Sequence, residues 1–107
     1  MLLDSDRILA VAFKMALFQL GIVVDSVVVF GSRARGDAHD ESDLDVLVVV
    51  ENIESDTRER IQMCAWEIGF EAGVLIQPVV KEKRRIEASS EASSMFMLSI
   101  AEDGIPV

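Results

Sequence analysis

Cysteine is almost absent from this sequence of 107 residues, which contains only Cys64. A single thiol excludes a framework of disulfides within the chain and a zinc site built from several cysteines. Cys64 lies in an apolar stretch with helical spacing, so we expect it to be a thiol packed in the core.

Basic residues are scarce relative to acidic ones, with 10 Lys and Arg against 19 Asp and Glu and a net charge of −9. A nucleic-acid surface needs clustered Lys and Arg to displace the counterions of phosphates. We therefore expect no such surface. A partner that carries phosphate must be met locally, by a metal or a few arginines, which favours a small nucleotide over a polymer.

Long hydrophobic runs are also missing. The longest, residues 20–30, is interrupted by Asp25 and is far shorter than the ~20 residues of a membrane span. The first ten residues carry acids where a secretory signal carries bases. We therefore expect a cytoplasmic protein without a membrane segment. Half of the residues are hydrophobic, and the length predicts a single domain over residues 1–107.

Hydrophobic spacing predicts helices that alternate with short strands. The expected strands are residues 26–30, 43–50 and 74–80, with Pro78 favouring an edge or a bulge in the last. The expected helices are residues 5–20, a second one begun by a capping box of Asp56 and Glu59, a short one within 81–94, and residues 94–104. This order predicts an α/β (α+β) fold of two or three layers, with the directions of the strands left open.

The first predicted helix carries two apolar rows instead of one. Ser5 or Asp6 is expected to cap it. One row contains Ile8, Val11, Met15 and Phe18, and the other contains Leu9, Phe13, Leu17 and Leu20. A helix packed on two sides and a surface for a partner both explain so broad an apolar arc.

Asp43 and Asp45 stand at the start of the second predicted strand. Side chains two residues apart on a strand point to the same face, so the two carboxylates project together while Leu44 and Val46 face the core. Paired carboxylates repel each other, and a divalent cation such as Mg²⁺ or Mn²⁺ would relieve the repulsion.

The segment before these acids, residues 31–42, has features that suit a phosphate ligand. Gly31 ends a buried strand and allows a sharp turn, and Ser32 is a good N-cap residue for a helix, whose free amides attract phosphate. Arg33 or Arg35 can add charged hydrogen bonds to a triphosphate.

The stretch FGSRARGDAHDESDLDVLVV resembles the minimal nucleotidyltransferase (MNT) branch of the DNA polymerase β-like superfamily almost residue for residue, and the likeness extends over nearly the whole chain. The resemblance implies a mixed sheet flanked by helices. It also implies that Gly31 and Ser32 bind the phosphates of a nucleoside triphosphate such as ATP, and that Asp43 and Asp45 hold Mg²⁺ and are the catalytic acids. Members of this family move a nucleoside monophosphate to an acceptor hydroxyl and release pyrophosphate.

The sequence departs from this family at the third metal-binding carboxylate, which active members carry on the next core strand. Leu75 falls at that position and cannot bind a metal. Gln77 offers one neutral oxygen on the same face, while Glu71 or Glu67 could reach the site only with a different register.

Three functions therefore stay open. The first is a metal-dependent nucleotidyltransferase whose acceptor is presented by a partner. The second is a degenerate protein that binds nucleotide and partner without turnover, since small MNT proteins resemble the antitoxin half of pairs with helical HEPN proteins. The third is a solvated acidic loop without a ligand. The broad apolar face of the first helix suits a HEPN-type partner or a homodimer.

Overall fold

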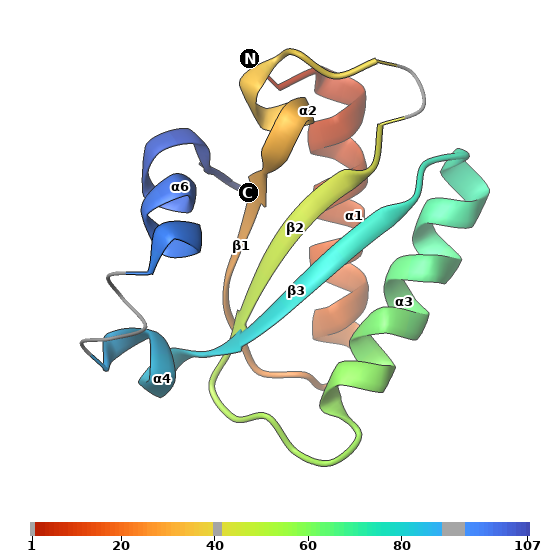
Figure 1. Ribbon diagram of the computed structural model, residues 1–107. Helices are drawn as coiled ribbons and strands as arrows, with labels where there is room; N and C mark the ends of the chain where they lie inside the picture. Colours follow the sequence, from red (N-terminus) through yellow and green to blue (C-terminus); the bar gives the residue numbers. More distant parts are fainter. Residues whose placement is uncertain (1, 40–41, 89–93) are drawn as a thin grey trace.

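The computed structural model describes residues 2–39, 42–88 and 94–107 (Figure 1). Its elements in chain order are α1 (Asp4–Gln19), β1 (Val24–Phe30), α2 (Gly31–Arg35), β2 (Leu44–Val50), α3 (Thr57–Ala72), β3 (Ile76–Glu82), α4 (Lys83–Glu87), α6 (Met95–Asp103) and β4 (Ile105–Pro106). In the described part of the chain, no helix combines the length and the hydropathy that crossing a membrane requires.

The four strands form one mixed sheet in the order β3-β2-β1-β4. β1 pairs antiparallel with both β2 and β4, and β2 pairs parallel with β3 through the crossover helix α3. The mixed sheet flanked by helices confirms the predicted α+β fold. Pro78 lies in β3 at the end of this strand order, as its residue type predicted, because proline cannot donate to a neighbouring strand.

One face of the sheet packs against α1 and α3 and forms the larger core (Figure 1). β2 supplies the centre of that core: Leu44, Val46 and Val48 have no exposed surface. Cys64 is buried in the same core, as its setting predicted.

The other face of the sheet packs against α6 and is only partly covered. Leu47 and Val49 of β2 pack there against Ile100 of α6. Phe30 of β1 meets Phe96 of α6 edge to face, with ring centroids 5.3 Å apart. α6 lies beside β1 on this face (Figure 1), and side chains such as Phe30 and Val79 are only half-buried there.

Several local predictions were wrong. α1 begins at Asp4 with Leu3 as its N-cap residue, so neither Ser5 nor Asp6 caps it. Asp56 makes no side-chain cap bond within the described residues; the Thr57 hydroxyl instead accepts from the Glu54 amide at 2.9 Å.

Two further differences concern larger elements. Strand β4 was not predicted, because its two residues offer no alternating pattern and depend on pairing with β1. The idea that α1 packs on two sides was also wrong: Leu9, Phe13 and Leu17 are buried, whereas the other apolar row is exposed. Residues 89–93 of the expected loop lie outside the described residues.

Candidate active site

Asp45 lies on the partly covered face of the sheet, between β1 and β3. Its register partner on β1 is Phe30, and its partner on β3 is Gln77. Leu44 and Val46, on either side of Asp45, point into the opposite core, which confirms the predicted alternation along β2. The carboxylate therefore lies on the partly covered face and is itself half-buried.

Asp43 lies close enough for its charge to act on Asp45. The pKa of Asp45 is raised above 3.8, first by burial of the carboxylate and second by the negative charge of Asp43. The Arg35 guanidinium acts in the opposite direction, which places it near the same carboxylate. Asp45 is thus a carboxylate whose ionised form lacks sufficient compensation within the protein.

This donor set fits a hard divalent cation. Carboxylate oxygens are the ligands that Mg²⁺ prefers, and the charge of such an ion would offset both the burial and the Asp43 repulsion that raise the pKa of Asp45. Asp43 and Asp45 are the residues that would hold it.

Gly31 makes room for the Asp45 carboxylate. Gly31 has φ +77°, a left-handed conformation that favours glycine, and a Cβ built on it would overlap the carboxylate oxygen of Asp45. The turn from β1 into α2 therefore runs directly against the Asp45 carboxylate. Ser32 lies in the first turn of α2, but Phe30 is the N-cap residue and no described side chain caps the helix, so the prediction that Ser32 caps it was wrong.

The two arginines of α2 have different surroundings. Arg35 is exposed and forms an ion pair with Asp37 at 3.2 Å. The Arg33 side chain is only 9% exposed, and its Nη1 donates to Asp6 Oδ1 at 2.7 Å. Among the described residues, Arg35 is the arginine that lowers the pKa of Asp45, so the predicted phosphate contact has its better candidate there.

Arg33 also fixes the chain immediately before the acidic pair. Its Nε and Nη2 donate to the Ser42 carbonyl at 2.9 and 2.6 Å. One guanidinium therefore ties α1 and α2 to the residue that precedes Asp43. This makes Arg33 a positioning residue in the structure.

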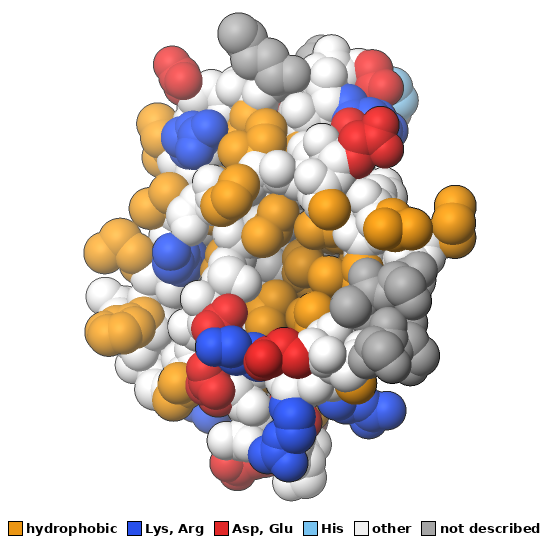
Figure 2. Space-filling model, turned by 90° about the vertical axis from the view of Figure 1, so that its left-hand side faces the viewer, with side chains coloured by type: hydrophobic (Ala, Val, Ile, Leu, Met, Phe, Trp, Pro, Cys, Tyr) orange, Lys and Arg blue, Asp and Glu red, His pale blue; other side chains and the backbone are white. Residues whose placement is uncertain are grey.

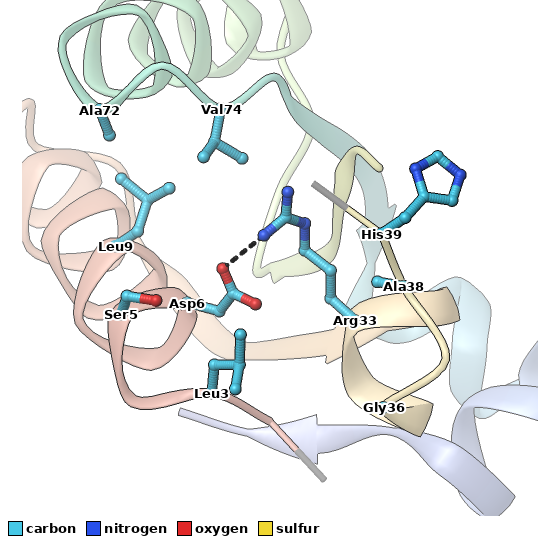
Figure 3. Close-up of a pocket in the computed structure, with 10 residues that line it drawn as sticks. All are labelled: Leu3, Ser5, Asp6, Leu9, Arg33, Gly36, Ala38, His39, Ala72 and Val74. Atoms are coloured by element: carbon cyan, nitrogen blue, oxygen red, sulfur yellow. Dashed lines mark hydrogen bonds and ion pairs between the residues drawn. The ribbon is translucent and has the colours of Figure 1, made fainter. Parts of the chain in front are cut away.

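The Asp6–Arg33 pair lies in a cavity of about 490 Å³ (Figure 3). The two side chains point toward each other there, with Leu3, Leu9 and Val74 around them and His39 at one side. Asp6 was interpreted as a cap, and its structural role was missed. Its place in the core-facing row with Leu9 and Phe13 was the available signal, because a charge on a buried helix face needs a partner.

The position of the third carboxylate is occupied by neutral side chains. The Leu44 amide donates to the Leu75 carbonyl at 2.9 Å, and Gln77 sits directly beside Asp45 in the register. Glu71 is exposed in the last turn of α3, and Glu67 lines a groove between α1 and α3. Among the described residues, no group of three His, Cys, Asp or Glu side chains could hold a metal.

Comparison with known families gives one clear match. The model of the nucleotidyltransferase domain family matches residues 13–96, which include both strands of the site and the whole 31–45 segment.

A Methanocaldococcus jannaschii protein described as a candidate protein adenylyltransferase is 36% identical over 61 residues. The match covers 56% of this chain and 62% of that relative, so this chain spans less than two thirds of its length.

Two solved structures share the fold. One is a toxin–antitoxin complex with AMP-PNP (TM-score 0.58, 18% identity, 89% of this chain and 69% of that chain). The other is a complex of the tri-AMPylated HEPN toxin of Shewanella oneidensis with its MNT antitoxin (TM-score 0.54, 14% identity, 94% and 70%).

Proposed function

Because this chain belongs to the nucleotidyltransferase domain family, we propose that it transfers AMP from ATP to a hydroxyl group on a partner protein. The observation that carries the proposal is the acidic pair: Asp45, with its raised pKa, lies beside Asp43 and against the backbone of Gly31. We assign the whole chain to one such domain and place the protein in the cytoplasm, where ATP and Mg²⁺ are both available.

Each residue of the segment has a proposed role. Asp43 and Asp45 hold Mg²⁺ or Mn²⁺, which when bound neutralises the phosphates and polarises the α-phosphoryl group. Gly31 and Ser32 present backbone amides to the phosphates, and Arg35 adds a positive charge to them. Arg33 keeps the segment in place through Asp6 and the Ser42 carbonyl.

The reaction balances without a further reagent. The acceptor oxygen forms a bond to the α-phosphorus, the bond from that phosphorus to the bridging oxygen breaks, and pyrophosphate leaves with the electron pair. The hydroxyl proton passes to water. Gln77, in register with Asp45, orients groups by hydrogen bonding but is a poor base, so we expect slow turnover.

The acceptor is proposed to be a tyrosine or other hydroxyl on a helical HEPN-type toxin. Support comes from the fold shared with the two toxin–antitoxin complexes and from the similarity to a candidate adenylyltransferase.

The test is transfer of label from ATP carrying ³²P at the α-phosphate, with Mg²⁺ or Mn²⁺, to a HEPN protein encoded beside this chain. We expect labelling that falls by about 10²–10⁴-fold in Asp43→Asn, the loss typical of removing a metal-linked catalytic group. Asp4→Asn removes an exposed acid on α1 and should label normally. Equal labelling by Asp43→Asn and the original protein would refute the proposal.

A second function is favoured by Leu75 and Gln77, which replace the third carboxylate. In this alternative the chain binds ATP with a metal and holds the partner without turnover. Calorimetry distinguishes the two: metal-dependent ATP binding that is lost in Asp43→Asn, with no label transferred under either metal, supports binding alone.

A further inference from the structure

The outer face of α1 is an apolar stripe that nothing in the described chain covers. It consists of Ile8 (69% exposed), Val11 (37%), Met15 (59%) and Phe18 (80%). Their spacing of three, four and three residues places them on one side of the helix. Hydrophobic side chains run down the left of Figure 2, where basic side chains lie beside them. A stripe of this length on a water-soluble surface indicates a docking face.

The exposed area of the stripe matches what a small symmetric dimer needs. At these exposed fractions the four side chains offer roughly 400–500 Å². A standard interface buries about 800 Å² on each partner, and about 65% of a homodimer interface is apolar. The stripe alone therefore supplies most of the apolar area of one half of such an interface.

We propose that a second copy of this chain covers the stripe, with the two α1 helices antiparallel about a twofold axis at the level of residue 13. In that arrangement Ile8 lies opposite Phe18 of the other copy, and Val11 lies opposite Met15. Each branched, shorter side chain thus faces a long one. Ala12, exposed beside the axis, lets the helices approach to about 8–10 Å. A stripe with this symmetric spacing fits an isologous contact, in which each pair occurs twice.

The charges on α1 favour self-association there, although the chain as a whole carries −9. The exposed charged residues of α1 are Asp4 and Arg7, which balance each other, and half-buried Lys14 donates to the Val107 carbonyl at 2.7 Å, so this face is less acidic than the molecule as a whole. Asp6 does not add to the charge of the surface, because it is buried against Arg33.

The outer face of α3 is a second apolar surface, and comparing it with α1 shows which of the two a second copy of the chain would cover. It also exposes large apolar residues, namely Met63, Trp66 and Phe70. Exposed Glu67 stands one helical turn from Met63 and beside Trp66, so two copies meeting there would bring carboxylates together. A second copy therefore fits α1, whereas α3 does not favour it.

The first experiment measures the mass of the intact chain in solution at about 50 µM, a concentration at which a standard-size interface is expected to be populated. We expect twice the chain mass of 11.8 kDa. The double variant Ile8→Glu with Phe18→Glu should be monomeric, with the dissociation constant of the dimer raised at least ~100-fold. The matched variant Met63→Glu with Phe70→Glu, on α3, should remain dimeric. Circular dichroism checks that both variants fold.

A monomeric original chain, or a dimer that survives the α1 substitutions, would overturn the proposal. So would a dimer that is lost only in the α3 variant. None of these outcomes depends on ATP or on transfer, so the proposed chemistry is tested separately.

A second experiment tests the antiparallel arrangement by disulfide formation. In a Cys64→Ala background, one preparation carries Ile8→Cys and another carries Phe18→Cys. We expect a disulfide-linked dimer only when the two are mixed and oxidised, because positions 8 and 18 of different copies are then opposite. Two copies of position 8 would lie about 15 Å apart along the axis. Cross-linking of either preparation alone, or none in the mixture, would overturn the arrangement.

Discussion

Asp6 and Asp45 are both withdrawn from water, but only Asp6 has a cation bonded to it. The Asp6 carboxylate is 4% exposed and bonded to Arg33, which also holds the Ser42 carbonyl. Asp45 is partly buried beside another acid, with exposed Arg35 as its partial compensation. The charge of Asp6 is compensated within the chain by Arg33, and this pair stabilises the fold. The charge of Asp45 is compensated only in part, so this carboxylate is the one that a bound cation can stabilise.

Removing Arg33 should have the largest effect on stability. Arg33→Met leaves Asp6 buried without its cation, and we expect the free energy of unfolding to fall by about 3–5 kcal/mol. Urea denaturation measures the change. Arg35→Met removes an exposed pair and should cost no more than about 1 kcal/mol. If the two substitutions cost the same, Asp6 and Arg33 do not have the structural role assigned to them.

Substituting Gly31 should lower both the stability of the fold and the affinity for a cation at Asp45. Gly31→Ala adds a Cβ where the Asp45 carboxylate lies and at a φ of +77°. The conformation alone costs roughly 1–2 kcal/mol, and the carboxylate must also move. Thermal unfolding should show a lower Tm, and Mn²⁺ titration should show weaker binding. Gly21→Ala, also at positive φ but with open space around it, controls for the backbone strain. Equal effects on Mn²⁺ binding in both variants would contradict the close approach.

Adding a third carboxylate beside Asp43 and Asp45 should strengthen the binding of a cation there. Leu75 is 46% exposed and adjoins the strand that carries the acidic pair, so Leu75→Asp should be tolerated. We expect Mn²⁺ affinity to rise about tenfold, since cation affinity follows the number of charged ligands. Leu75→Asn is the matched control without charge. An unchanged affinity in Leu75→Asp would place position 75 outside the cation site.

The role of a residue could be predicted from the sequence where its contacts are set by neighbours along the chain, and not where they come from distant segments. Alternation along β2 placed Leu44 and Val46 in the core and the acids opposite, because strand geometry is set by neighbours in sequence. Arg33 differs from Arg35 because it bonds Asp6, and the two residues are 27 positions apart. No periodicity in the sequence indicates that contact. The sequence offered Arg33 or Arg35 as a contact of the phosphate, and the tertiary contact with Asp6 distinguishes them.

The helix ends and strand β4 were also hard to predict, because the local sequence does not determine them. Asp56 and Glu59 have the spacing of a capping box, but Thr57 bonds Glu54 instead, and both arrangements suit the same residues. Strand β4 has two residues and exists through its pairing with β1. The two rows on α1 gave equal periodicity, so only packing could decide which one is buried.

The smallest effect should come from Asp45→Asn. The raised pKa means that the folded state binds the proton of Asp45 more tightly than the unfolded chain does. Between pH 3.8 and that raised pKa, this group makes stability fall as the pH rises. Asp45→Asn should therefore raise the free energy of unfolding at pH 7 by a few tenths of a kcal/mol, a partly solvated group giving no more. Urea denaturation at pH 5 and pH 7 measures it, and a clear loss of stability would contradict the interpretation.

The antiparallel pairing of β1 and β2 has a consequence for how the protein assembles. These strands are joined by residues 31–43, a short loop whose closure costs little entropy, whereas β3 must wait for the long crossover of residues 51–75. Gly31 and Asp45 therefore meet within the earliest hairpin available to the chain. During synthesis, the segment proposed to contact phosphate and metal could form while the third strand is still inside the ribosome.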